Sequence, residues 1–187
     1  MRATPGEQRR ALEGDGLISA PFATATHAIL IRRDRRDVWP WLVQMGAGRA
    51  GWYSYDRLDN GGEPSAERIR PDLQSIEVGA VMPALPGIRE GFVVVSFEPE
   101  RSIVLGWPDA RRGHTVTWAF VLDERAAGTT RLLTRVRAAG GYRLFGLPLP
   151  APLTKLLTLL VHFVMQRRQL MGIARRAEAA PPQPPTP

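Results

Sequence analysis

The chain has 187 residues, no cysteine and a formal charge of +7, which fits one domain with loose ends and excludes disulfides, a thiol nucleophile and a cysteine-ligated metal site. The charge is regional. Residues 1–124 carry 15 arginines against 17 acidic residues, whereas residues 125–187 carry nine arginines and one lysine against one acidic residue. A basic region is typical of proteins that bind nucleic acid, a membrane surface or an acidic ligand.

Both ends of the chain differ in composition from its middle. Residues 1–20 are polar and dotted with glycine, which predicts an N-terminal arm, and residues 178–187 hold five prolines, which predicts a disordered tail. Residues 21–177 are then a single domain. No apolar segment marks a secretory signal, and the most apolar stretch, 153–165, is shorter than the roughly 20 residues that span a bilayer. We therefore expect a soluble, cytoplasmic protein.

Between these ends the hydrophobic period changes twice, so the order of elements can be predicted. A strand at 26–32 precedes a helix that Asp34 or Asp37 caps, in whose first turn Pro40 is best tolerated, and a second helical piece covers 53–58. The later elements are strands at 76–82, 91–97, 102–107, 114–122 and 130–137, and one long helix at 155–177. Closely spaced strands pair antiparallel, so the chain is α+β and its sheet buries the helix across one face.

Several blocks of the sequence resemble a known superfamily. They include ATHAILI, VWPWLVQMGAGRAGWYSYDRLDN, TWAFVL, TRLLTRVR and FVMQRRQLMGIARRAE. These look like the START-like or SRPBCC superfamily, and more narrowly its bacterial polyketide-cyclase-like members. The resemblance covers about residues 20–178 and implies the helix-grip fold, in which a curved antiparallel sheet wraps a long C-terminal helix around a mostly apolar cavity. It implies no single chemistry, and Gly79-Ala80 stands where this family often has Gly-Asp.

Motifs for cofactors and catalysis are weak. Residues 46–51 match G-x-G-x-x-G, but they follow a helix instead of a strand, which favours a flexible turn that closes over a pocket. The three histidines, His27, His114 and His162, lack the spacing of metal ligands, and no G-x-S-x-G nucleophile motif is present. We therefore expect no metal and no cofactor, and we assign no catalytic residue. The missing motifs do not exclude a cyclase, in which Tyr53, Tyr55, Asp56, His114 or Arg135 would serve as acid/base or oxyanion partners.

Aromatic residues supply the first candidates for a ligand site. His114, Trp118 and Phe120 alternate on one face of a strand that should look toward the helix. Core packing and ligand contact both remain open for them, and Trp118 and His114 need a polar partner if buried. The segment from Trp52 to Asp56 packs aromatic, hydroxyl and carboxylate groups together. It either lines a pocket mouth or packs as an ordinary helix.

Arginines supply the second group of candidates. Arg135 shares a strand face with Leu133, so it is either solvated or points inward with that leucine. Arg167 lies at helical spacing among apolar residues expected to face the sheet, and it then needs a carboxylate such as Asp56 or an anionic ligand. That apolar stripe is Leu156, Leu160, Phe163, Val164, Met171 and Ala174.

These observations lead to three hypotheses about function. The first is non-catalytic binding of a small hydrophobic or amphipathic molecule, such as a lipid or a polyketide, between sheet and helix. The second is a cyclase or aromatase-like enzyme that uses the same cavity, and the third is membrane-surface contact through the basic C-terminal third. We expect no nucleic acid partner and no stable membrane insertion. The candidate ligand-binding residues are Trp52, Tyr53, Tyr55, Asp56, Trp107, His114, Trp118, Phe120, Arg135, Phe163 and Arg167.

Overall fold

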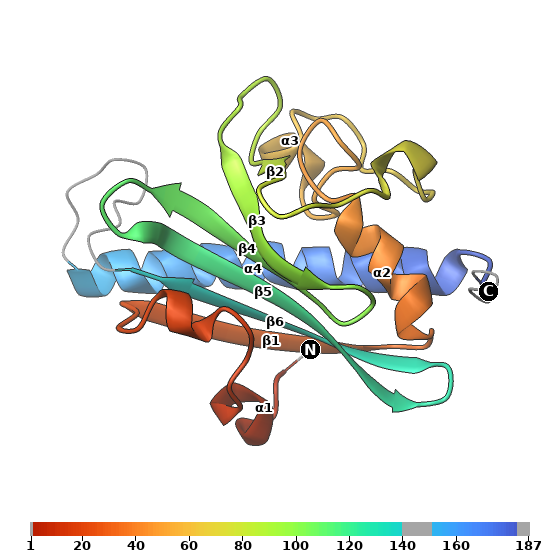
Figure 1. Ribbon diagram of the computed structural model, residues 1–187, viewed down its shortest axis with the longest axis horizontal. Coiled ribbons are helices and arrows are strands. Elements are labelled where there is room, and N and C mark those ends of the chain that lie inside the picture. The colour runs from red at the N-terminus through yellow and green to blue at the C-terminus, as the bar shows by residue number, and fades with distance from the viewer. Residues whose placement is uncertain (1, 140–150, 183–187) are drawn as a thin grey trace.

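A computed structural model describes residues 2–139 and 151–182. Its main elements are six strands and one long helix, which crosses the sheet along its whole length (Figure 1). In chain order the elements are α1 (Pro5–Arg9), a 3-10 turn η1 (Asp15–Leu17), β1 (Ala23–Ile31), α2 (Arg35–Val43), α3 (Asp56–Asp59), η2 (Pro71–Leu73), β2 (Val81–Pro83), β3 (Gly91–Glu98), β4 (Ser102–Asp109), β5 (Gly113–Ala126), β6 (Thr129–Ala138) and α4 (Ala151–Ala179).

The six strands form one antiparallel sheet in the order β1-β6-β5-β4-β3-β2. The predicted α+β helix-grip class is therefore confirmed, and five of the six predicted strands lie where expected. The exception is the predicted strand 76–82, of which only Val81–Pro83 pairs with β3. Gly79 has a φ of 92° and the Ala80 amide donates to the Glu77 carbonyl at 3.1 Å, so this segment turns before it can extend.

Helix α2 begins after Asp34, one of the two expected capping positions. Pro40 lies inside the helix, beyond the first turn in which it is best tolerated, so one intrahelical hydrogen bond is lost there. The next three residues compensate by burial: Trp41, Leu42 and Val43 are at most 1% exposed. The helix thus anchors the chain in the core before the glycine-rich turn begins.

The inward face of α4 differs from the predicted stripe. Leu170, Ile173 and Ala177 are fully buried against the sheet. The expectation for most of the stripe was wrong, because its described members Leu160, Phe163, Val164 and Met171 are 42–55% exposed; only Ala174 of that set is buried, and the side chain of Leu156 lies outside the described residues. The helix is turned so that a polar row, His162, Gln166 and Gln169, faces inward instead. The predicted tail beyond residue 182 also lies outside the described residues.

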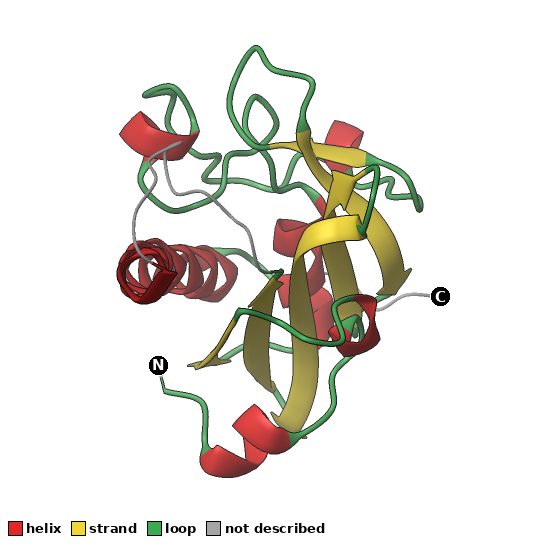
Figure 2. Ribbon diagram, turned by 90° about the vertical axis from the view of Figure 1, so that its left-hand side faces the viewer, coloured by secondary structure: helices red, strands yellow, loops and turns green. Residues whose placement is uncertain are grey.

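The N-terminal arm begins beside the edge strand β1, and its later part, with η1, lies on the face of the sheet opposite α4 (Figure 2). Arg135, on β6, reaches into it and donates to the backbone carbonyls of Glu7, Gln8 and Arg10 at 2.8–3.0 Å and to the Asp15 carboxylate at 2.6 Å. The expectation that Arg135 points into the grip between sheet and helix was therefore wrong. Leu133 does point the same way, but both side chains face the arm.

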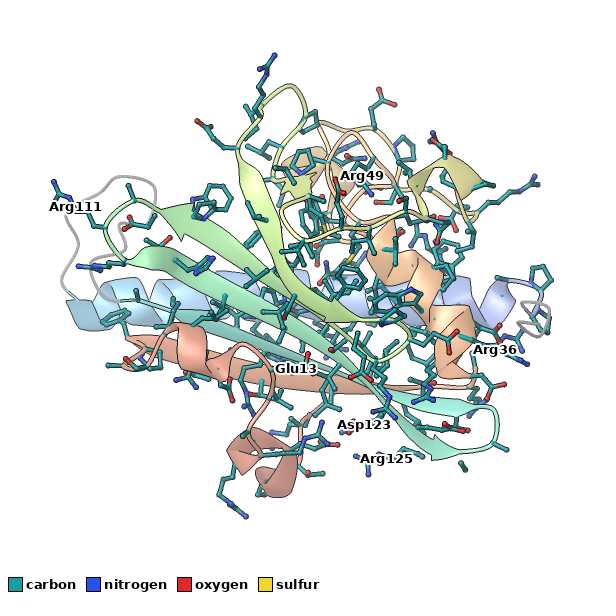
Figure 3. All side chains as sticks on the ribbon, in the orientation of Figure 1. Glu13, Arg36, Arg49, Arg111, Asp123 and Arg125 are labelled. Atoms are coloured by element: carbon teal, nitrogen blue, oxygen red, sulfur yellow. The ribbon has the colours of Figure 1, made fainter. Side chains whose placement is uncertain are left out.

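The neighbouring arginines of β6 also bind the arm instead of being solvated. Arg131 donates to both carboxylate oxygens of Glu7 at 2.9 Å, and Arg137 donates to the Ile18 carbonyl at 2.9 Å. The hydrogen bonds from Arg131 hold the pKa of Glu7 at about 2. At the end of β5, Asp123 and Arg125 extend the same ionic surface, as Figure 3 shows.

Candidate ligand cavity

A cavity of about 330 Å³ lies between the sheet and the middle of α4, at residues 159–169. Strands β1, β5 and β6 form its floor, α4 forms one wall, and the segment after the glycine-rich turn forms the other. The lining residues are Ala23, Ala25, Trp52, Ser54, Asp59, Ala84, Phe92, Val116, Trp118, Val136, Ala138, Leu159, His162, Met165, Gln166 and Gln169.

Three aromatic rings make the apolar wall. Trp52 and Trp118 are stacked, with ring centroids 5.6 Å apart and planes at 19°, and Phe92 meets both edge-on at 5.3–6.0 Å. The indole Nε1 of Trp52 donates to the Pro83 carbonyl at 3.2 Å. Since the polar edge of Trp52 is satisfied elsewhere, its ring offers only apolar surface to a ligand.

The glycine-rich turn is what places Trp52. Gly46 and Gly51 form a pair of backbone hydrogen bonds at 2.9 and 3.2 Å, which folds the motif back on itself. At Gly51, φ is 78° and a Cβ would lie 2.2 Å from the Ser65 Oγ, so no other residue fits. The motif therefore acts as a turn beside the cavity. Its glycines are required because the backbone adopts positive φ at Gly46 and Gly51 and leaves no room for a Cβ at Gly51.

A row of polar side chains on α4 faces the cavity. His162, Gln166 and Gln169 follow one another at i, i+4 and i+7, which places them on one side of the helix. Gln166 accepts a hydrogen bond from Trp118 Nε1 at 3.0 Å and donates to Gln169 at 2.8 Å. This chain satisfies the buried amides and explains why α4 turns a polar row inward. It also supplies the polar partner that a buried Trp118 was expected to need.

Asp59 is the one carboxylic acid among the described lining residues. Its side chain is 7% exposed, and its Oδ1 has no hydrogen-bond partner among the described residues. Burial, and then the charge of Asp56, raise the pKa of Asp59 to about 6. A carboxyl group that titrates near neutrality with a free oxygen can bind a hydrogen-bond donor or, when protonated, donate to an acceptor.

His162 faces the same cavity and packs against a second histidine. Its ring centroid lies 5.6 Å from that of His27 on β1, and neither Nε2 has a partner among the described residues. Burial, and then repulsion by His27, lower the pKa of His162 to about 4, while burial lowers the pKa of His27. Both imidazoles are therefore neutral at pH 7, and the described lining contains no lysine or arginine.

The histidine pair predicts an acid-sensitive contribution to stability. Unfolded His162 takes up a proton near pH 6.5, whereas the folded residue resists protonation down to about pH 4, so the contribution is present above pH 6.5 and is lost as the pH falls to 4. The pH-dependent contribution of Asp59 to stability has the opposite sign. Because its pKa is raised in the folded state, it adds stability as the pH falls below 6.

We therefore expect His162→Gln to gain stability relative to the wild type on acidification, by about 3 kcal/mol between pH 7 and pH 4. Urea unfolding at several pH values measures this difference, in which the contribution of Asp59 cancels. If His162→Gln instead lost stability in parallel with the wild type over this pH range, the assignment would be contradicted.

Of the predicted ligand residues, two line the cavity: Trp52 and Trp118. The inward direction of the β5 face is as predicted, but Phe120 is fully buried beneath Trp118, with ring centroids 4.9 Å apart. The Trp107 ring packs edge-on against Phe92, with ring centroids 5.3 Å apart. His114 lies over Gly106, where an added Cβ would be 2.2 Å from its ring. These three support the wall without lining the cavity.

The other aromatic and acidic candidates lie on the far side of the same segment. Tyr53 is buried with a φ of 59°, and its hydroxyl accepts a hydrogen bond from Gln44 at 2.8 Å. Its pKa is raised by burial. Asp56 accepts a hydrogen bond from the Ser65 amide at 3.1 Å, and Tyr55 is 40% exposed beneath the Arg168 guanidinium. None of the three is among the residues that line the cavity.

The predictions for Phe163 and Arg167 were wrong in orientation. Phe163 is 46% exposed, and its ring packs on the edge of the histidine pair, 5.7 Å from His27. Arg167 is exposed on α4 and is not among the residues that line the cavity, and the Asp56 carboxylate binds the Ser65 amide instead. Both errors follow from assuming that the most apolar side of α4 faces the sheet.

The lining residues that sequence reasoning missed are mainly polar or small. Ser54 lies within the segment from Trp52 to Asp56 but was not among the candidate ligand residues, and Asp59 lies three residues beyond that segment. The row His162, Gln166 and Gln169 carried a usable signal, since three polar residues at helical spacing inside an apolar segment indicate a polar lining.

The described part of the chain offers neither a cluster of metal ligands nor a membrane-spanning helix. Over residues 2–139 and 151–182, no group of three or more histidine, aspartate or glutamate side chains is arranged to hold a metal ion. In the same part of the chain, no helix has the length and apolar character needed to cross a bilayer.

Comparison with known proteins finds similarity in structure only. No family model matches the sequence, and no curated protein sequence matches it. A conserved protein of unknown function from Enterococcus faecalis has a TM-score of 0.49 and 15% identity, covering 87% of this chain and 77% of its own. An aromatase/cyclase from a Streptomyces species has a TM-score of 0.48 and 14% identity, with 83% and 93% covered. A polyketide-cyclase-like protein from Corynebacterium glutamicum has a TM-score of 0.43 and 17% identity, with 84% and 92% covered.

Proposed function

We propose that the protein binds a small, neutral and largely apolar molecule in the cavity between the sheet and α4, without catalysing a reaction. The observation that carries this proposal is the combination of an aromatic wall with two polar atoms that have no partner among the described residues, Asp59 Oδ1 and His162 Nε2. Buried polar atoms are ordinarily satisfied, so a ligand is the group expected to satisfy these.

The size and walls of the cavity limit the ligand. A volume of about 330 Å³ is at the lower end of the range for small-molecule sites and suits a fused two- or three-ring compound. The stacked indoles of Trp52 and Trp118 present flat surface, against which a planar ring packs with the largest gain.

The charge of the lining selects neutral ligands over acids. Asp59 is the ionisable acid in the described lining, His162 is uncharged at pH 7, and no arginine or lysine lies among these residues. A buried carboxylate on the ligand would have no counter-ion and would face Asp59. A hydroxyl group, in contrast, can donate to the Asp59 carboxylate.

Three naphthalene probes test the proposal through quenching of tryptophan fluorescence. We expect 2-naphthol to bind at least about tenfold more tightly than naphthalene, because of the hydrogen bond to Asp59, and 2-naphthoate to bind more weakly than either. Asp59→Ala should remove the advantage of 2-naphthol and leave naphthalene affinity within about twofold.

Asp72→Ala is the matched control, because Asp72 is an exposed carboxylate paired with Arg70 and lies outside the cavity lining. It should leave the affinity for all three probes unchanged. Preference for naphthoate, or failure of all three probes to bind, would refute the proposal.

A second candidate is a cyclase or aromatase-like enzyme that uses the same cavity. It is favoured by the presence in one cavity of two groups whose pKa values are about 6 and about 4, since such groups can serve as acid and base. Native mass spectrometry of the purified protein separates the two candidates. A retained molecule that stays chemically unchanged on incubation supports binding, whereas one that loses water supports the enzyme.

A further inference from the structure

The outward side of α4 carries an apolar row that no described element covers. Leu160, Phe163, Val164 and Met171 are 55%, 46%, 42% and 44% exposed, and their spacing places them on one side of the helix. We call this set the outer ridge. In Figure 2, α4 is seen nearly end-on beside the sheet, with its far side turned away from the strands. Single exposed apolar residues are ordinary, but an aligned row marks a contact surface.

Arginines are interleaved with the outer ridge. Arg167, Arg168 and Arg175 are exposed on the same side of the helix. Arg168 lies over the Tyr55 ring at 5.9 Å, and Arg175 pairs with Glu67 at 2.6 Å while its side chain stays 66% exposed. The one acid on this side of α4, Glu178, lies near the C-terminal end and accepts a hydrogen bond from the Arg32 amide. The ridge is therefore apolar and flanked by positive charge.

We propose that the outer ridge docks on the surface of an anionic lipid bilayer, with α4 lying in the plane of the interface. An apolar row bordered by arginines is the pattern of interfacial helices, whose apolar side chains enter the acyl boundary while their guanidinium groups reach the lipid phosphates. The helix does not cross the bilayer, since it lacks the apolar character for a span.

The same features disfavour other occupants. A second copy of the chain seated on the ridge would bring Arg167 and Arg168 against their own counterparts, at a cost in repulsion. Nucleic acid would engage the arginines but would leave Leu160 and Met171 without an apolar partner. An anionic bilayer satisfies both kinds of side chain, because it offers negative charge at its surface and hydrocarbon just below.

Docking in this position would bring the ligand cavity close to the membrane. His162, Gln166 and Gln169, on the other side of the same helix, line the cavity. The outer ridge is nevertheless a different surface from the ligand cavity, and docking through it does not depend on which ligand the cavity holds.

Co-sedimentation with vesicles tests the inference. At low salt, we expect the wild-type protein to pellet with vesicles that contain phosphatidylglycerol and to stay in solution with pure phosphatidylcholine. Two triple variants should each lower the partition coefficient at least about tenfold, one by removing apolar contact and one by removing charge. They are Leu160→Gln/Val164→Gln/Met171→Gln and Arg167→Gln/Arg168→Gln/Arg175→Gln; glutamine preserves helix propensity, and circular dichroism verifies folding.

The matched control removes the same charge from elsewhere on the surface. It is Arg9→Gln/Arg89→Gln/Arg111→Gln, at exposed positions away from α4; Figure 3 shows Arg111 on the loop that joins β4 and β5. Partitioning of this control within about twofold of the wild type supports the proposal. The proposal is overturned if the wild type does not bind anionic vesicles, if the control loses as much binding as the ridge variants, or if the ridge variants turn a dimer into a monomer in sedimentation.

Discussion

Replacing Arg135 with methionine is expected to lower the free energy of unfolding by about 3–5 kcal/mol. The guanidinium is 4% exposed and donates to three backbone carbonyls, those of Glu7, Gln8 and Arg10, and to the Asp15 carboxylate. Methionine has similar length but no donor, so these acceptors lose their partner while the arm still covers them. An unpartnered buried acceptor costs about 1–3 kcal/mol, which makes this loss much larger than that of a surface ion pair.

Urea unfolding measures the loss, and limited proteolysis locates it. Cleavage within residues 2–20 should become faster in Arg135→Met before the domain itself is attacked, because the arm is what loses its contacts. Arg111→Met, on the exposed loop between β4 and β5, should change the unfolding free energy by less than about 0.5 kcal/mol. A similarly small change in Arg135→Met would show that the arm contributes little to stability.

The second large effect is expected at Gly172, in α4. In a helix interior, glycine to alanine ordinarily stabilises by about 1 kcal/mol. Here a Cβ at position 172 would lie 2.3 Å from the Tyr53 carbonyl oxygen and 3.0 Å from its Cβ. The backbone of Tyr53 cannot yield easily, because its φ is 59° and its amide donates to Ser65 Oγ at 3.1 Å. We expect Gly172→Ala to destabilise by about 2 kcal/mol or more.

The segment that would be displaced also carries Trp52 and Ser54 of the cavity wall, so Gly172→Ala should weaken naphthalene binding as well. Gly6→Ala is the control, since Gly6 lies in α1 with its nearest neighbour 3.9 Å from an added Cβ. That change should be neutral or stabilising. If Gly172→Ala is as stable relative to the wild type as Gly6→Ala, the close approach of the Tyr53 backbone to α4 does not fix the position of the cavity wall.

The fold could be predicted from the sequence because each element carries its own periodicity. The alternation through Trp118 and Phe120 showed which face of β5 turns toward the helix, and α2 begins after Asp34, one of the two positions expected to cap it. The cavity could be predicted only in part, because its lining breaks the simple rule that apolar residues face inward. His162 and Gln166 point into the fold, while Leu160 and Met171 point out of it.

The arginines of β6 show a different limit of sequence reasoning. Whether Arg135 is solvated, faces a ligand or holds another segment depends on what covers that face of the sheet, and the strand pattern does not contain this information. The covering segment lies more than 100 residues earlier, since Glu7 and Arg135 are 128 positions apart. A polar arm with few apolar residues gives no hydrophobic pattern that would reveal where it packs.

The pairing of the first strand with the last has a consequence for the order of folding. β1 pairs only with β6 in the sheet, and the arm that precedes β1 depends on arginines of β6, so the first 31 residues have few partners until the chain has been made to Ala138. Contacts of such high sequence separation form slowly, because a long loop must close before they contribute. The β3–β4–β5 meander has local pairings and can form first. Closure of the sheet by β1, followed by docking of the arm, is then the late step of folding, and it completes the floor of the cavity.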